Sequence, residues 1–419
     1  MTATNTKKEI KVYAHWQGLQ EPAPMGMLSV SPAKGKESFS FEYAATWLKS
    51  GFSQIIDPDL QLYSGAYYPR DDKPNFGVFL DSCPDRWGRV LMQRREAAIA
   101  KQEDRAAKKL LDSDFLLGVY DGYRMGALRF KLDIDGPFLN DNKEMAAPPW
   151  TSLRELEHAS LHFEEDNTDD PKYLKWLTML IAPGSSLGGA RPKASVVDIH
   201  NNLWIAKFPS RNDDKDIACW EMVTNELAIT AGLKVAEGKL LRFDNKYHTY
   251  ITKRFDRTTG GERIHFASAM TLLGHIDGAD ASGASYLELM EFISRYGASV
   301  EKDLEELWRR IVFSISVKNT DDHLRNHGFL LNEKGWLLSP AFDINPNEYG
   351  RGLSLNITDT DNSLDLDLAM EIARYFRLSN IKASQIIKEV AIAVKGWQKV
   401  ATKFKISNAE QERMSAAFA

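Results

Sequence analysis

Alternating apolar and polar residues dominate the first seventy residues of the chain. The segments IKVYAHW (10–16), MGMLSVSP (25–32) and SFSFEY (38–43) place apolar side chains at about every second position. A period of two is typical of strands that bury one face in a core. The pattern predicts a β-rich leading segment.

A second pattern begins near residue 86. Residues 86–112 carry apolar positions punctuated by Arg, Gln and Glu, which predicts a helix. Residues 131–150 are rich in Asp, Asn and Pro and predict a linker. Residues 151–180 have helical periodicity interrupted by an acidic loop. We therefore expect a leading subdomain at 1–150.

The remainder of the chain passes from strands to helices. LWIAKFP (203–209) reads as an apolar strand, and a helix follows from Ile217 to Ala231, where Gly232 ends it. KLLRF and HTYITKRF predict a hairpin, and the pattern from about 265 is mostly helical with one inserted hairpin. The chain is predicted to be α+β and two-lobed, with a β-rich lobe at 151–256, a helical lobe at 257–419 and a ligand cleft between lobes.

The composition of the chain mainly excludes some classes of binding partner and site. The chain has 419 residues with 43% hydrophobic and 26% charged residues, which is ordinary for a globular protein. The net charge of -5 gives no general attraction to nucleic acid or anionic membrane. Cys83 and Cys219 lack metal-ligand spacing, which predicts inert core thiols. With no signal sequence and no long apolar run, we expect a cytoplasmic protein without membrane contact.

The strongest chemical signal is NTDDHLRNHGFLL at 319–331. Asp321 and Asn326 have the D-x-x-x-x-N spacing with which kinases place a catalytic base and a Mg²⁺ ligand. A capped, solvated loop would show the same short pattern. Asp343 follows 17 residues after Asn326, beyond a predicted hairpin that would return it to this loop. Together the three residues predict a Mg²⁺ site for phosphoryl transfer.

Two weaker signals predict ATP binding. PGSSLGGARPK (183–193) has glycines that allow backbone N–H groups to approach phosphates, although an ordinary turn would also explain them. Lys207 lies within an apolar strand, where phosphates and a helix glutamate would satisfy its charge. Glu221 and Glu226 are the candidate partners, and an edge-strand lysine is the alternative. His323 and His327 lack a third ligand, which favours a structural role over zinc.

These segments resemble the HipA family of bacterial toxin kinases. PGSSLGGARPKA, WIAKFP, KRFDR, NTDDHLRNHGFLL and LSPAFDINP occur in that family's order, and MGMLS, FSFEYAATWL and FLDSCPDRWGR are similar to its leading subdomain. The resemblance spans about residues 10–400. By matching motifs it implies the following site: the catalytic base Asp321; the Mg²⁺ ligands Asn326 and Asp343; the ATP-binding residues Lys207, Glu221, Ser185, Ser186, Leu187, Gly188, Gly189 and Asn326; and the hinge residues Lys253 and Phe255.

The resemblance also implies a biological role. It suggests a serine/threonine kinase that uses ATP and Mg²⁺ and acts as the toxin of a type II toxin–antitoxin pair. The partner would be a helix-turn-helix antitoxin that also binds operator DNA, and the protein substrate a translation component such as an aminoacyl-tRNA synthetase. Ser186, or alternatively Ser185, would be autophosphorylated.

Asp322 departs from the family pattern, since a glycine occupies this place in some members. Its charge beside Asp321 predicts either a raised pKa for Asp321 or a second metal ion. Two other functions remain compatible with the residues. One is a small-molecule or lipid kinase on a related scaffold, and the other is a catalytically silent module that binds an antitoxin or DNA complex.

Overall fold

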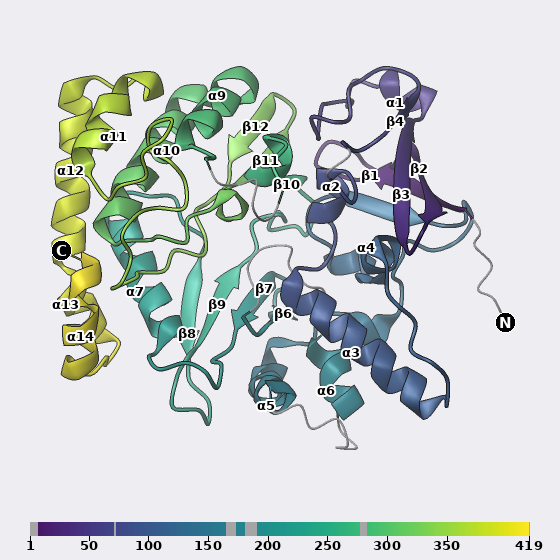
Figure 1. The fold of residues 1–419 in the computed structure, drawn as a ribbon, viewed down its shortest axis with the longest axis horizontal. Helices are drawn as coiled ribbons and strands as arrows, with labels where there is room; N and C mark the ends of the chain where they lie inside the picture. The colour runs from purple at the N-terminus through teal and green to yellow at the C-terminus, as the bar shows by residue number, and fades with distance from the viewer. Residues whose placement is uncertain (1–6, 71–72, 165–172, 181–190, 277–282, 419) are drawn as a thin grey trace. The chain divides into compact units, whose positions relative to one another are not determined.

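The computed structural model describes residues 7–70, 73–164, 173–180, 191–276 and 283–418. The chain divides into two compact units (Figure 1). The first comprises Met1–Ala206 and Asp256–Ala267, and the second Lys207–Phe255 and Ser268–Ala419. The three-part division expected from the sequence stays a prediction.

The first unit is built on an antiparallel sheet of five strands in the order β4-β3-β2-β1-β5 (Figure 1). The buried side chains alternate along β3, where Phe39, Phe41 and Tyr43 enter the core beside Phe76 and Phe79. The predicted period of two is therefore confirmed. The strands are β1 (Lys8–Ala14), β2 (Ala23–Ala33), β3 (Lys36–Tyr43), β4 (Ala66–Tyr67) and β5 (Leu128–Lys131), and β6 (Lys193–Val197) and β7 (Leu203–Lys207) form a further pair.

The helix predicted at 86–112 is shorter than expected. It ends at Gln102 because Asp104 adopts a left-handed conformation (φ 48°) and the Arg105 N–H bonds back to the Ala100 carbonyl. A separate helix begins at Asp112. The helices of this unit are α1 (Ala45–Leu48), α2 (Gly77–Asp81), α3 (Arg86–Gln102), α4 (Asp112–Gly118), α5 (Leu153–Glu164) and α6 (Tyr173–Leu180), with 3₁₀ turns η1 (Asp121–Tyr123), η2 (Lys143–Met145) and η3 (Trp150–Ser152).

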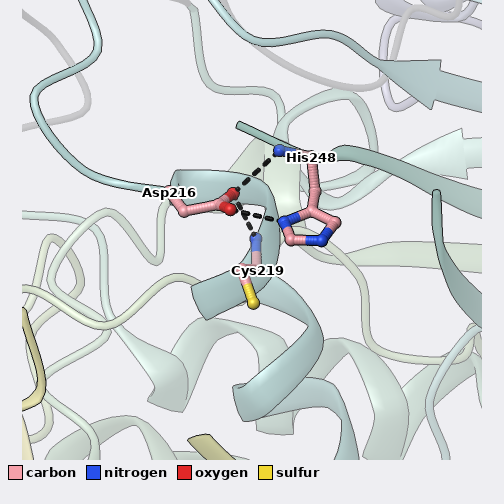
Figure 2. A group of neighbouring side chains, drawn as sticks. All are labelled: Asp216, Cys219 and His248. Carbon is pink, nitrogen blue, oxygen red and sulfur yellow. Dashed lines mark hydrogen bonds and ion pairs between the residues drawn. The ribbon is translucent and has the colours of Figure 1, made fainter. Parts of the chain in front are cut away.

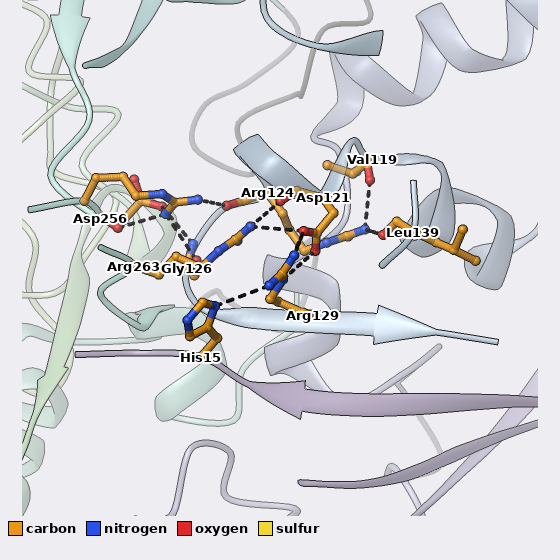
Figure 3. A network of polar contacts seen from close by, with 10 residues as sticks. His15, Val119, Asp121, Arg124, Gly126, Arg129, Leu139, Asp256 and Arg263 are labelled. Carbon is orange, nitrogen blue, oxygen red and sulfur yellow. Dashed lines mark hydrogen bonds and ion pairs between the residues drawn. The ribbon is translucent and has the colours of Figure 1, made fainter. Parts of the chain in front are cut away.

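A buried guanidinium joins the irregular segments of the first unit (Figure 3). Burial lowers the pKa of Arg124 to about 10, so that this side chain remains charged near neutral pH. Its two terminal nitrogens donate to four carbonyls at 2.7–2.9 Å, those of Ser82, Leu116, Val119 and Leu139. One side chain thus joins the ends of α2 and α4 to the segment that contains Leu139.

We expect Arg124→Lys to destabilise the protein by about 2–3 kcal/mol. A lysine ammonium carries its donors on one atom and cannot reach four carbonyls arranged around a planar fork, so buried acceptors lose their partners. Chemical denaturation measures the change. Arg377→Lys is the matched control, because Arg377 lies at the surface against Glu301. Equal stability of the two variants would contradict this role for Arg124.

The second unit is mainly helical, with two antiparallel hairpins (Figure 1). Its strands are β8 (Gly238–Leu241), β9 (Thr249–Lys253), β11 (Gly328–Asn332) and β12 (Gly335–Leu338), while β10 (Phe266–Ser268) falls at the division of the units. Its helices are α7 (Ile217–Thr230), α8 (Ala269–Leu272), α9 (Tyr286–Tyr296), α10 (Val300–Ser316), α11 (Leu366–Ile372), α12 (Asn380–Lys395), α13 (Trp397–Lys403) and α14 (Asn408–Met414), with 3₁₀ turns η5 (Leu324–Asn326), η6 (Ala373–Phe376) and η7 (Ser415–Phe418).

Several predicted boundaries in this unit are confirmed. Helix α7 ends near Ala231, and Gly232 has the left-handed conformation (φ 82°) that closes it. Both predicted hairpins form, β8–β9 and β11–β12. No helix among the described residues is long and apolar enough to cross a membrane.

Candidate active site

Lys207 is the centre of a buried ion cluster in the second unit. It is the last residue of β7, and Pro209 follows two residues later. Its Nζ lies 2.5 Å from Glu221 Oε1 and 2.7 Å from Asp343 Oδ1. Burial would lower the pKa of Lys207, but the carboxylates of Asp343 and Glu221 outweigh that effect and raise it. The lysine is therefore a fixed positive charge.

Helix α7 supplies the glutamate. Asp216 caps this helix by accepting a hydrogen bond from the Cys219 N–H, and the following turn directs Glu221 into the core with a relative exposure of 4%. The alternative candidate, Glu226, instead pairs with Lys403 at 2.6 Å. Of the two glutamates considered from the sequence, the structure brings Glu221 to Lys207.

Asp343 reaches the lysine through the β11–β12 hairpin. After β12, Ala341 forms backbone hydrogen bonds with Lys234 and Ala236 in the segment after α7. Asp343 then adopts a left-handed conformation (φ 57°), which is uncommon for residues other than glycine. Strained backbone of this kind persists where surrounding contacts fix it.

The loop containing Asp321 begins where α10 ends. Lys318 takes a left-handed conformation (φ 46°), and the Asn319 N–H bonds back to the Ser314 carbonyl, which closes the helix. The chain then forms η5, where Asn326 donates from its side-chain amide to the Asp321 carbonyl at 2.9 Å. The five-residue spacing seen in the sequence thus corresponds to a direct contact between these two residues.

Hydrogen bonds join this loop to the segment that carries Asp343. The Asn345 N–H donates to Asn319 Oδ1 at 3.1 Å, and the Asn347 side chain donates to Thr320 Oγ1 at 2.8 Å. The hairpin therefore brings the segment after β12 back beside the loop of Asp321, as the sequence analysis predicted. Asp321, Asn326 and Asp343 come from two stretches of chain that lie side by side.

Asp321 itself is open to solvent, with a side-chain exposure of 84%. Partial removal from water raises its pKa, His323 at 4.0 Å opposes the shift, and the charges of Asp343 and Asp322 add to it. The raised pKa that the sequence analysis attributed to Asp322 therefore has several causes, of which Asp322 is the smallest. A carboxyl with a raised pKa is a better proton acceptor than an ordinary aspartate.

Asp322 points in the opposite direction, into the core. Tyr286 Oη donates to it at 2.5 Å, Ser314 Oγ lies at 3.3 Å, and His327 Nε2 lies at 2.9 Å. Burial would raise the pKa of Asp322, but His327 and Tyr286 outweigh that effect and lower it. Its oxygens are therefore committed to a structural network.

The donor set around Asp343 fits a hard divalent cation. The side-chain oxygens of Asn326 and Asn345 are buried and have no hydrogen-bond partner among the described residues. Each amide is oriented by its nitrogen, which donates to the Asp321 carbonyl in Asn326 and to Asp343 Oδ1 in Asn345. Carboxylate and amide oxygens are the ligands that Mg²⁺ takes in proteins, and a bound ion would satisfy these buried oxygens.

Asn345 was missed by the sequence analysis, which singled out only Asp343 in this segment. The available signal was an amide two residues after the predicted metal ligand. Its orientation toward Asp343 depends on its contact with Asn319, which no local pattern reveals.

The remaining predicted residues are placed as follows. The Lys253 N–H already donates to the Glu237 carbonyl at 2.8 Å, and the Phe255 ring packs 5.5 Å from that of Phe342. The phosphate-loop residues lie outside the described residues: Ser185, Ser186, Leu187, Gly188 and Gly189.

A second polar cluster in this unit is explained by helix capping (Figure 2). Asp216, Cys219 and His248 bring ligand-type atoms within 4.8 Å of one another. However, Asp216 Oδ1 accepts from the N–H groups of Cys219 and His248, and Oδ2 lies 2.5 Å from His248 Nδ1. The positive end of the α7 dipole also disfavours a cation there. Burial raises the pKa of the Cys219 thiol, and Cys83 and Cys219 are both free and buried, as expected for core cysteines.

Comparison with known proteins identifies the family of the chain. Residues 185–397 match the model of the HipA-like C-terminal domain, which is about half of the chain. The chain belongs to this HipA-like family. The resemblance inferred from the sequence motifs is thereby confirmed.

Individual relatives of this HipA-like chain are distant. It is 26% identical over 179 residues to a Haemophilus influenzae protein named "Putative kinase" and 25% identical over 181 residues to a Sinorhizobium fredii protein named "Putative kinase Y4mE". These matches cover 38% of this chain, which spans 52% and 41% of the length of those two relatives.

The fold has a solved counterpart along nearly the whole chain. A Shewanella oneidensis MR-1 structure, of HipA with HipB and its operator DNA, matches 97% of this chain and 94% of that chain. The TM-score is 0.64 at 16% sequence identity. The predicted α+β, HipA-like fold is confirmed.

Proposed function

We propose that this HipA-like chain is a serine/threonine protein kinase that uses ATP and Mg²⁺ and acts as the toxin of a type II toxin–antitoxin module. The observation that carries the proposal is the cluster of Lys207, Glu221 and Asp343 beside the loop of Asp321 and Asn326. Family membership and the kinase names of two relatives support the same class of activity.

The charges of the cluster suit the binding of ATP together with Mg²⁺. Lys207 contributes one positive charge and Glu221, Asp343 and Asp321 three negative ones, so the site as a whole attracts a divalent cation. Mg²⁺, when bound, would neutralise phosphate charge during transfer. Asp343, Asn326 and Asn345 would hold it, and Lys207 would bind the α- and β-phosphates of ATP while Glu221 keeps its ammonium in place.

Asp321 would act on the attacking hydroxyl. The substrate oxygen forms a bond to the γ-phosphorus, the bond from that phosphorus to the bridging oxygen breaks, and ADP leaves. The hydroxyl proton passes to the Asp321 carboxylate, whose exposure leaves room for a protein substrate. The Asp321 carbonyl is fixed by Asn326, so the base is positioned by the residue proposed to hold the metal.

The proposal extends to partners and regulation. The Shewanella counterpart is a complex with HipB and operator DNA, which supports a helix-turn-helix antitoxin as the partner of this chain and indirect contact with operator DNA. The substrate we propose is a translation component such as an aminoacyl-tRNA synthetase. Ser186, or alternatively Ser185, would receive phosphate and inhibit the enzyme by charge repulsion of ATP.

We expect Asp343→Asn to lower ATP-dependent phosphate incorporation by at least about 10²-fold, because the neutral amide weakens the attraction for Mg²⁺. Titration calorimetry with ATP, with and without Mg²⁺, should show that the variant has lost the Mg²⁺-dependent part of nucleotide binding. Radiolabelled ATP measures turnover, and mass spectrometry of the same samples locates phosphate on Ser185 or Ser186.

Asp359→Asn is the matched control, since Asp359 is an exposed aspartate of the same unit. It should behave as the unaltered chain. A fully active Asp343→Asn variant would refute the proposed metal site, and Mg²⁺-dependent ATP binding without any phosphate transfer would support the silent-module alternative.

A further inference from the structure

A hollow in the first unit lies beside the first half of β3, far along the chain from the candidate active site. Its volume is about 660 Å³. The walls come from β3, the segment after β4, helix α3 and the start of α4. Its lining includes Lys36, Phe39, Tyr68, Arg89, Lys109 and Phe115.

One wall of this pocket is an open sheet edge. Strand β3 pairs with β2 along its whole length, from Lys36 to Tyr43. On its other side β4 covers only Phe41 and Glu42. Within the described residues, no strand pairs with the outer side of residues 36–40. Alternate residues of such an edge direct N–H and C=O groups outward, where an added strand can bond to them.

The rim of the pocket is positively charged although the whole chain is acidic. Lys36, Arg70 and Lys109 are exposed. Arg70 already pairs with Asp59 at 3.3 Å, and Lys109 Nζ donates to the Gly35 carbonyl at 3.2 Å, so no carboxylate pairs with Lys36 or Lys109 within the described residues. The acidic lining residues are already engaged, because Glu37 accepts from Ser113 at 2.6 Å and Asp112 pairs with Arg89 at 3.0 Å. Two further acids, at positions 71 and 72, lie outside the described residues.

The floor is apolar and offers room for side chains. Phe39 and Phe115 are buried beneath the pocket, and the Arg89 guanidinium stacks 4.6 Å from the Phe115 ring. Tyr68 stands at the side with 69% exposure. An extended strand directs alternate side chains to opposite faces, so an apolar residue can face the floor while its neighbour faces the basic rim.

We propose that this surface binds an extended acidic segment of a partner protein, which adds as a strand to the open edge of β3. The edge supplies backbone hydrogen bonds, the floor accepts alternate apolar side chains, and Lys36 and Lys109 pair with carboxylates. The five edge residues match a bound segment of about five residues, or roughly 16 Å of strand. This proposal is independent of kinase activity.

A polyanion such as single-stranded nucleic acid would pair with the basic residues of the rim but would not use the sheet edge or the apolar floor. The acidic segment is favoured because the edge and the apolar floor call for a peptide backbone with alternating side chains, and neither feature contributes to binding a phosphate chain.

The test uses the full chain and a fluorescein-labelled heptapeptide of alternating glutamate and valine. Fluorescence anisotropy should show saturable binding that weakens with added salt. We expect the double variant Lys36→Glu/Lys109→Glu to bind at least about tenfold more weakly, because two attractions become repulsions. Circular dichroism checks that this variant is folded. Lys388→Glu/Lys395→Glu, with the same change of net charge on exposed positions of α12, should bind normally.

Two matched ligands distinguish binding through strand hydrogen bonds from binding through charge alone. The heptapeptide methylated at alternate backbone nitrogens keeps its charge but loses strand hydrogen bonds, and it should bind at least about tenfold more weakly. An oligonucleotide of equal charge should not compete. The proposal is overturned if the parent peptide does not bind, if the rim variant binds as well as the unaltered chain, if methylation has no effect, or if the oligonucleotide displaces the peptide.

Discussion

Asp321→Asn is expected to reduce phosphate incorporation by about 10²–10⁴-fold while leaving the protein folded. The amide cannot accept the hydroxyl proton, and at 84% side-chain exposure the carboxylate supports little of the surrounding structure. The backbone carbonyl that accepts from Asn326 is unchanged by the substitution. Steady-state assays with labelled ATP and a protein substrate measure the loss, which should fall on kcat.

Three readouts make this result specific. Thermal unfolding should be unchanged, and calorimetry should show retained Mg²⁺-dependent ATP binding, because the proposed metal ligands are intact. Asp359→Asn again serves as the exposed control and should retain full activity. An Asp321→Asn variant with normal kcat would exclude Asp321 as the base, whatever the role of Asp343.

Asp322→Ala is expected to destabilise the second unit by about 3–5 kcal/mol, the largest stability effect that we predict. The substitution leaves a buried tyrosine hydroxyl and a buried histidine without the carboxylate that now holds both. Calorimetric unfolding or urea titration measures the loss. Tyr286→Phe removes only one hydrogen bond and should cost about 1–2 kcal/mol.

The double variant Asp322→Ala/Tyr286→Phe tests the network directly. Because the two side chains interact, its cost should be less than the sum of the single costs. If Asp322 were instead a second metal ligand, Asp322→Ala would retain its stability and lose Mg²⁺ binding. That outcome would restore the alternative that the sequence left open.

The pH dependence follows from the lowered pKa of Asp322. A folded pKa below that of an unfolded aspartate, which is about 4, gives a stabilising contribution that is present above that value. The contribution is lost as the pH falls through the folded pKa. The stability difference between the unaltered chain and Asp322→Ala should therefore shrink on acidification below about pH 4.

Local patterns in the sequence predicted many of the strands and helices correctly. The period of two along β3 identified both the strand and its buried face, since a strand exposes alternate residues whatever its partners are. Gly232 marked the end of α7 because the closing residue needs a left-handed backbone. The helix after residue 86 was overextended, since Asp104 gives no comparable signal for the same conformation.

The sequence by itself determined which residue types are available for the chemistry and in which order. The spacing of Asp321 and Asn326, and the hairpin before Asp343, are local features that follow from short-range backbone geometry. They predicted the loop and the return of the third residue, and the motifs were sufficient to suggest the family.

Only the tertiary structure decided how these side chains are used. Glu221 and Glu226 lie five residues apart on one helix and therefore face different sides of it, and packing decides that the first side meets Lys207 and the second meets Lys403. Adjacent aspartates diverge, Asp321 to solvent and Asp322 to Tyr286, because Asp322 has a buried hydrogen-bond partner 36 residues away in the chain. Contacts between residues distant in the chain produce no periodic pattern in the sequence. The sequence therefore identifies the functional side chains but does not predict which way each one points.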